Sequence, residues 1–186
     1  MGKNISAVNI KKLWHVDAKD FAEALKDTAD LTGDLLKTIL STAKEVTNIH
    51  QDTWTIEEGE PSQDSYKNQL TGATYRMGAK QMGDVTFNWT IGQYDYATKA
   101  EFMGGTGTEK SWKRERGAVV KEKALIALTE DDQYCVLPKA NITAREAQTD
   151  GAIGIAVVGT MMEPDNVKIS PEYWFDKSEV YPEEEE

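Results

Sequence analysis

The segment DVTFNWTI, residues 84–91, alternates apolar and polar side chains at every position. Alternation with a period of two is typical of a β-strand that has one face in a core and the other facing water or a partner. The preceding segment ATYRMGAK, residues 73–80, alternates as well, and the link at 81–83 is short. We therefore expect the two segments to pair as a long antiparallel hairpin. The apolar side of 84–91 holds Val85, Phe87, Trp89 and Ile91, and its polar side holds Asp84, Thr86, Asn88 and Thr90.

A second alternating segment, GAIGIAVVGTMME at residues 151–163, has one side that is mostly small. Glycine weakens a strand unless another group must come close to the backbone. We expect the small side to face a closely packed layer of the fold, with a neighbouring copy of the protein as a further candidate cover. The pair Asp150–Gly151 favours a two-residue turn, which would join residues 141–147 to this strand.

The rest of the chain has the pattern of short strands with helices inserted between them. Strands are expected at 5–16, 53–58, 124–129 and 134–138, the last closed by Pro138, with a polar loop at 58–69. Helices are expected from Asp17 or Asp20 to residue 29, at 34–43 with strand as the alternative, and at 94–105 between an Asp95 cap and a Gly104–Gly105 stop.

These elements predict a mainly β (α+β) fold, with two packed antiparallel sheets or a distorted β-barrel and one or two flanking helices. A chain of 186 residues suits a single domain, which we place at 1–176, with 17–50 as a helical or arm-like insertion. Residues 177–186 end in EEEE and are expected to form a disordered acidic tail.

The net charge of −11 argues against affinity for nucleic acid or anionic membranes, because both would repel the protein. It does not argue against DNA passing by without binding. The sequence contains no apolar stretch long enough to span a bilayer and no signal-peptide pattern. Its single cysteine, Cys135, rules out a disulfide within the chain, which fits a reducing compartment or a fold that needs no disulfide.

The residue types that carry catalysis or bind metals form no persuasive constellation. His50 and Asp52 could pair as a catalytic dyad, but a solvated loop histidine is the simpler interpretation. Neither histidine has metal-ligand spacing, and Cys135 has no CxxC partner. The glycine-rich MGGTGT at 103–108 follows a helix instead of preceding one, so it lacks the helix N-terminus that holds phosphate. We expect no enzyme activity, no cofactor and no metal.

The connection between Glu109 and Lys123 has six basic and three acidic residues, a local charge of +3 on an acidic chain. Trp112 lies among these charges, next to Lys113, Arg114 and Arg116. Basic groups around an aromatic ring can bind single-stranded nucleic acid. They can also dock on an acidic surface of another subunit, such as EEGE at 57–60, or simply form a solvated loop. The acidic background makes the nucleic-acid interpretation the weakest of the three.

Four segments in order resemble the tail tube proteins of long-tailed bacteriophages: TGATYRMGAKQMGDVTFNWTI, YDYATKAEFMGG, KALIALTEDDQYCVLP and PKANITAREAQTDGAIGIAVVGTMME. The resemblance covers residues 70–163 and lies in the order of the elements and in their residue patterns. The secreted tube protein of type VI systems, the hemolysin-coregulated protein, is similar in the same way. The resemblance implies a β-sandwich subunit that forms hexameric rings. These rings would stack into a hollow tube whose acidic lumen lets DNA pass unbound.

On this basis we expect a structural, self-assembling subunit of a phage or prophage tail tube. It would be found in the virion tail, and in the host cytoplasm before assembly. Its partners would be copies of itself and other tail proteins, without a membrane. The alternative is a cytosolic β-sandwich binding module. Within the tube, Asp84, Thr86, Asn88 and Thr90 would face the lumen, as a strand lining a water-filled channel requires. Trp112, Lys113, Arg114 and Arg116 would form a contact between rings.

Overall fold

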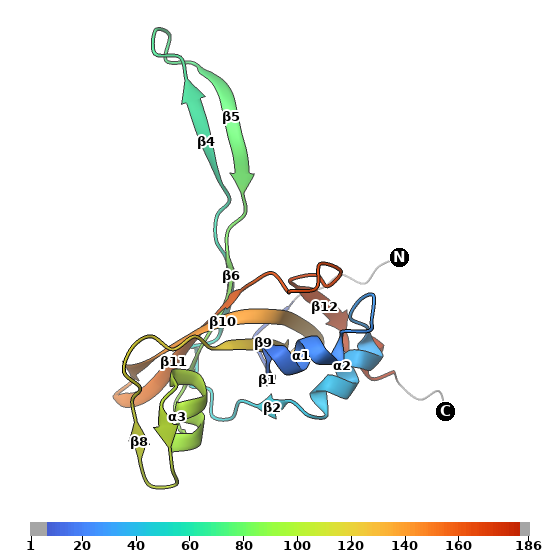
Figure 1. Cartoon of the computed structure of the whole chain (residues 1–186), viewed down its shortest axis with the longest axis vertical. Helices are drawn as coiled ribbons and strands as arrows, with labels where there is room; N and C mark the ends of the chain where they lie inside the picture. The colour runs from blue at the N-terminus through green and yellow to red at the C-terminus, as the bar shows by residue number, and fades with distance from the viewer. Residues whose placement is uncertain (1–6, 183–186) are drawn as a thin grey trace.

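The computed structural model describes residues 7–182, and the fold is mainly β, as the sequence predicts. A long arm of two strands projects from a body in which short helices flank one large antiparallel sheet (Figure 1). The strands of the large sheet follow the order β2-β1-β9-β10-β11-β6-β3, with β12 also paired to β10. The body strands are β1 Lys12–Asp17, β2 Lys44–Glu45, β3 Thr55–Glu58, β6 Val85–Ile91, β9 Glu122–Leu128, β10 Gln133–Thr149, β11 Ala152–Met161 and β12 Tyr173–Asp176.

Strand β10 bends the sheet into two layers. Its first half pairs with β9 and β12, and its second half pairs with β11. The register with β9 shifts between Leu137 and Ala140, beside Pro138. The expectation that Pro138 closes a strand is therefore wrong. Proline has no N–H for a ladder and is tolerated at irregular positions, so here it marks the bend in one continuous strand.

The two layers face each other across a core that includes Leu13, Phe87, Trp89, Leu125, Leu137 and Ile155. One layer is β2-β1-β9-β10 with β12, and the other is β10-β11-β6-β3. Within residues 7–182 the sheet does not close into a barrel, because its terminal strands β2 and β3 do not pair with each other. Of the two architectures predicted from the sequence, the packed-layer one is the closer description.

Helices α1 (Ala18–Ala24), α2 (Gly33–Leu40) and α4 (Lys177–Val180) cover the outside of the first layer. Strand β9 is buried on both faces, because Ala124 and Ile126 point toward these helices while Leu125 points into the inner core. Both helices expected before residue 50 are present, although Thr32 and not Asp34 caps α2. The expected disordered tail is corrected over 177–182, where Val180 of α4 is fully buried. Residues 183–186 lie outside the described residues.

The predicted pairing of residues 73–80 with 84–91 is wrong. Strand β5 (Thr74–Gln81) pairs with β4 (Ser62–Lys67), and β6 pairs with β3 and β11. The expected polar loop at 58–69 therefore contains a strand. Residues 55–91 form one hairpin in two parts, with β3 and β6 in the body and β4 and β5 in the arm. Its far end is closed where the Asn68 amide donates to the Ala73 carbonyl at 2.8 Å.

Several local predictions are confirmed. Helix α3 (Tyr96–Met103) begins where Asp95 Oδ1 accepts from the Thr98 amide at 2.7 Å, and it ends at glycines with φ of 73° and 85°. Asp150 and Gly151 both have positive φ in the turn between β10 and β11. The small side of β11 is closely packed only in part. Ala156 and Val158 are half-buried, whereas Gly154 is buried and a Cβ there would lie 2.8 Å from the Ile91 carbonyl oxygen. On the opposite, core-facing side, a Cβ at Gly159 would lie 2.4 Å from Leu125 Cδ1.

Candidate assembly interface

The arm of β4 and β5 stands clear of the body (Figure 1), and almost every residue in it is exposed. Tyr75 is 71% exposed and Met77 51%, while Leu70 at the tip is 94% exposed. An isolated two-stranded hairpin is marginally stable in water at best. Clustered exposed apolar side chains mark interaction surfaces. The arm therefore has the properties of a segment that becomes buried against another surface.

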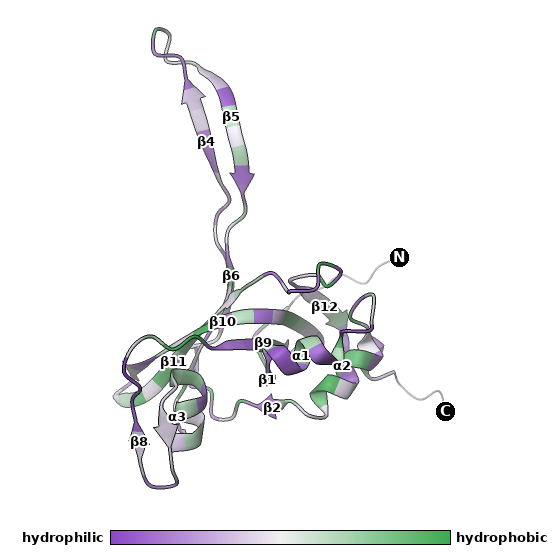
Figure 2. Ribbon diagram, viewed as in Figure 1, coloured by the Kyte–Doolittle hydropathy of each residue, from purple (hydrophilic) through white to green (hydrophobic). Residues whose placement is uncertain are grey.

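Hydrophilic and hydrophobic residues both occur along β5, as its purple and green bands show (Figure 2), and alternation places them on different faces of the arm. Tyr66 and Arg76 are paired across the strands, with the guanidinium carbon 5.7 Å from the ring centroid. The other face of β5 carries Tyr75, Met77 and Ala79, as alternation along a strand requires. Residues 62–81 contain three basic groups and one acidic group, a charge of +2, which leaves −13 for the rest of the chain of −11.

The outer face of the second layer is polar. Thr86 and Asn88 of β6 are half-buried there, and Asn88 Nδ2 donates to Thr55 Oγ1 of β3 at 3.0 Å. Thr90 is buried, with its amide donating to Thr53 Oγ1, and Asp84 lies exposed just before β6. Of the four residues predicted to face a lumen, Asp84, Thr86 and Asn88 are thus at least partly exposed, whereas Thr90 is covered within the subunit, which corrects the prediction at that position. The cross-strand neighbours on this face are Ala156, Val158 and Thr160 on β11 and Thr55 and Glu57 on β3.

Two edges of this second layer are open among the described residues. Strand β3 pairs with β6 alone, and residues 143–149 of β10 have β11 as their only strand partner. An open strand edge presents unpaired backbone N–H and C=O groups and is a template for pairing with another chain. Among the described residues, this layer therefore lacks a further strand partner at both of its edges.

The four residues proposed for the contact between rings divide into two kinds. Trp112 is held inside the subunit, because its Nε1 donates to the Gly104 carbonyl at 2.9 Å and Lys99 Nζ lies 4.3 Å from its ring centroid. Arg114 lies 3.7 Å from Glu146, which also binds Lys99. Lys113 and Arg116 are exposed and make no ion pair within the described part of the chain. These last two are free for an external partner.

Trp112 and Lys113 form β8, which pairs with β7 (Thr106–Gly107) in a small hairpin, and Arg114 and Arg116 follow directly after β8. This hairpin extends from the end of the body opposite to the arm (Figure 1). The hairpin packs beside α3, to which the indole of Trp112 is fixed through Gly104. The molecule thus has a projecting element at each of two opposite ends.

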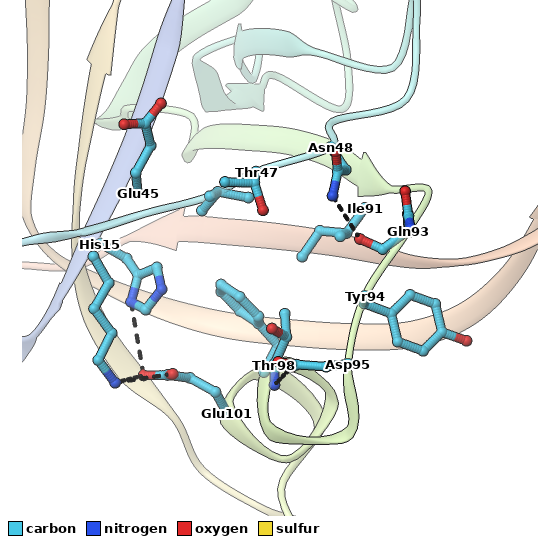
Figure 3. Close-up of a pocket in the computed structure, with 13 residues that line it drawn as sticks. His15, Glu45, Thr47, Asn48, Ile91, Gln93, Tyr94, Asp95, Thr98 and Glu101 are labelled. Carbon is cyan, nitrogen blue, oxygen red and sulfur yellow. Dashed lines mark hydrogen bonds and ion pairs between the residues drawn. The ribbon is translucent and has the colours of Figure 1, made fainter. Parts of the chain in front are cut away.

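A polar cavity of about 380 Å³ lies beside α3 and β1, with His15 and Glu101 on its wall (Figure 3). Lys123 is only 2% exposed, and its Nζ lies 2.9 Å from both Asp17 Oδ1 and Glu101 Oε1. Lys44 contacts Glu101 at 3.1 Å from the rim. The hydrogen bond from Lys123 lowers the pKa of Asp17, and Lys123 and Lys44 together outweigh burial to lower the pKa of Glu101. The cluster joins β1, β9 and α3.

His15 is buried beside this cluster, with Nδ1 3.9 Å from Glu101 Oε1 and its ring against Phe102. Burial, followed by the charge of Lys123, lowers the pKa of His15 to about 4. Sequence reasoning missed this cluster. The available signal was the alternation in KLWHVD, which places His15 on the same strand face as the buried Leu13.

Stability is expected to fall as the pH drops from about 6.5, the usual histidine pKa in an unfolded chain, toward about 4. His15 stays neutral in the folded protein over this range while the unfolded chain takes up a proton. This protonation should cost up to roughly 3 kcal/mol of unfolding free energy. The variant His15→Gln should lack this loss of unfolding free energy at low pH. Urea unfolding at pH 7 and pH 4.5 measures the loss for both proteins. An equal loss in both would contradict the lowered pKa of His15.

The structure also shows the surroundings of the other candidate residues, His50 and Cys135. His50 Nε2 lies 3.0 Å from Asp150 Oδ2 at the β10–β11 turn, so the suggested partner Asp52 is not its partner. Burial raises the pKa of the Cys135 thiol, which disfavours the reactive thiolate. Residues 7–182 contain no group of three metal-ligating side chains, and none of their helices is long and apolar enough to cross a bilayer. No protein-family model and no curated protein matches the chain.

Proposed function

We propose that the protein is a structural, self-assembling subunit of a phage or prophage tail tube, in which hexameric rings stack around a lumen that conducts DNA. The observation that carries this proposal is the arm. It exposes Tyr75, Met77 and Leu70 on a hairpin that has no body surface to pack against. A segment of this kind gains stability only when another molecule covers it, and other copies of the same chain are present during assembly.

The open edges of the second layer support the ring. Pairing of β3 in one copy with residues 143–149 of β10 in the next would continue the layer from subunit to subunit. Closure of such a ring removes both open edges of the second layer, which is the physical advantage of a closed sheet. The apolar side of β6 would remain in each subunit's core, while Thr86 and Asn88 would face the lumen.

The expected passage of DNA without binding is supported by the chemistry of this face. Its charged members are Glu57 on β3, Asp84 just before β6 and Arg145 on β10, a net charge of −1, so the face is weakly acidic. Binding to the DNA backbone requires several clustered cations that replace its counterions. A face built mainly of threonine, asparagine and alanine offers no such cluster, and the net negative charge of the chain adds repulsion.

Negative-stain electron microscopy of the purified chain over a range of protein and salt concentrations tests the proposal. Rings or tubes of uniform width with a central hole are expected. Single small particles under every condition would overturn self-assembly by the isolated chain. The salt series separates electrostatic association, which weakens as screening increases, from association through apolar burial.

Reversing the charge at the end of the β7–β8 hairpin and in the segment just after it is expected to reduce assembly at least tenfold without changing the fold. The double variant Lys113→Glu and Arg116→Glu changes only exposed residues, whereas Arg114 is left in place because it binds Glu146. Lys19→Glu with Lys168→Glu is the matched control, because these lysines are also exposed and lie elsewhere. Sedimentation measures the polymer fraction, and equal fractions for the two double variants would remove the hairpin from the interface.

The second candidate function is a cytosolic β-sandwich binding module. The observation that favours it is the cavity of Figure 3, which is open to solvent and lined by polar groups including His15, Thr98 and Glu101. A protein that remains monomeric and gains thermal stability with a small polar compound would support this function over the tube.

A further inference from the structure

A groove of about 300 Å³ lies between β3 and β12. Trp54 and Ile56 line it on one side and Trp174 on the other, with Ala127 and Cys135 between them. Trp174 is opposite Cys135 in the β10–β12 pair, and Cys135 is opposite Ala127 in the β9–β10 pair. The three side chains therefore share the inner face of the first layer, which is otherwise the face that packs in the core.

The second layer does not cover this part of the inner face, because it ends at β3. Trp174 is 41% exposed as a result, although its Nε1 is anchored to Glu172 Oε1 at 2.6 Å. Strand β12 has β10 as its one strand partner in residues 7–182, so its other edge stays open even when β3 pairs with β10 of the next copy in the ring. An extended segment entering the groove could add to an open edge and bury apolar side chains at the same time, which is the usual form of β-strand addition.

The arm has the chemistry that this groove requires. One face of β5 presents Tyr75, Met77 and Ala79, and both edges of the two-stranded arm are open among the described residues. The arm segment 62–81 carries +2 while the remainder of the chain carries −13, so the arm of one copy is attracted to the body of another. The acidic side chains at the groove are Glu57, which lines it, and Glu172, which binds Trp174.

The groove cannot be filled by the arm of the same subunit, because the arm projects away from the body (Figure 1). We propose that the groove between β3 and β12 is the docking site for the β5 face of the arm of a second copy of this chain. This inference rests on the proposed self-assembly and names the surface through which the arm acts.

Disulfide trapping tests the docking. In a Cys135→Ala background, Met77→Cys on the arm is combined with Ile56→Cys in the groove. Both native side chains are at least partly exposed, so the substitutions are tolerable. A disulfide requires two Cα atoms within about 7 Å. The two positions lie in different parts of one long hairpin, so a bond forms between copies. The matched control replaces Met77→Cys by Thr74→Cys, which lies on the opposite face of the arm.

Oxidation of the Met77/Ile56 pair is expected to give a ladder of covalent multimers on a non-reducing gel, at least tenfold stronger than that of the Thr74/Ile56 pair. Equal ladders for the two pairs would overturn the docking. Tubes in the microscope without a ladder would overturn the docking while leaving the tube function standing. Single particles without a ladder would overturn both.

Blocking the groove gives an independent measurement. Trp174→Arg introduces a cation and removes the apolar wall at an exposed position. At least a tenfold loss of polymer by sedimentation, with an unchanged circular dichroism spectrum, is expected. The control Tyr181→Arg changes an aromatic residue of equal exposure on the other side of the first layer. Assembly of the Trp174 variant to the control level would overturn the proposal.

Discussion

Replacing residues 60–83 with Asn–Gly is expected to abolish assembly and to leave the body folded. The Gly59 amide donates to the Asp84 carbonyl at 2.9 Å, so these two residues already face each other at the base of the arm. A two-residue turn can join such a pair, and Asn–Gly is the sequence that this turn favours. Because the arm packs against none of the body, its removal takes no side chain out of the core.

The free energy of unfolding of this variant is expected to stay the same or to rise by up to about 2 kcal/mol, because a shorter connection loses less entropy on closure. Urea unfolding measures that change, and sedimentation measures the loss of polymer. Replacement of Asp150–Gly151 by Asn–Gly is the control, since it introduces the same turn sequence where both residues already have positive φ. Polymer formation by the armless protein would disprove the role of the arm.

The sequence could predict the elements that face a core. Alternation in 84–91 identified β6 because each apolar residue there enters the inner core, and the Asp95 cap and Asp150–Gly151 turn were recognisable because local chemistry alone determines them. These features depend on neighbours along the chain. They required no knowledge of which strands pair.

The strands of the arm could not be predicted in the same way. Strand β4, with the sequence SQDSYK, has no alternating pattern because neither of its faces meets a core, and such a polar sequence is typical of a loop. With 62–67 predicted as a loop, the nearest alternating partner for 73–80 is 84–91, and the predicted pairing is therefore wrong. The prediction that Pro138 ends a strand is wrong for a related reason. In a sequence, a proline that ends a strand looks the same as one that marks a register shift within it.

The candidate interface shows the same limit. Exposed charge at Lys113 and Arg116 follows from a polar loop, but the pairing of Arg114 with Glu146 joins residues that are distant in the chain. The buried cluster of His15, Glu101 and Lys123 also comes from three separate elements. Lysine is rarely buried without a charged partner. The sequence of β9 alone does not explain the buried Lys123, because its partners Asp17 and Glu101 belong to other parts of the chain.

Phe87→Ala is expected to cost about 3–5 kcal/mol of unfolding free energy, the range for removing a large aromatic side chain from a packed core. Phe87 is completely buried, and its ring meets Trp54 edge-on with centroids 5.0 Å apart. The neighbouring control Asn88→Ala changes the outer face of the same strand. It removes a hydrogen bond to Thr55 at a half-buried position, so we expect a loss of about 1 kcal/mol.

Urea unfolding of both variants measures the difference between the two faces of β6. If Asn88→Ala were as damaging as Phe87→Ala, the outer face would belong to the core, and it could not line a lumen. A large loss for Phe87→Ala alone would mean that the inward side chains of this strand maintain the subunit. The outward threonine and asparagine side chains would then not be required for folding, and they would be available to line the inner surface of the assembled tube.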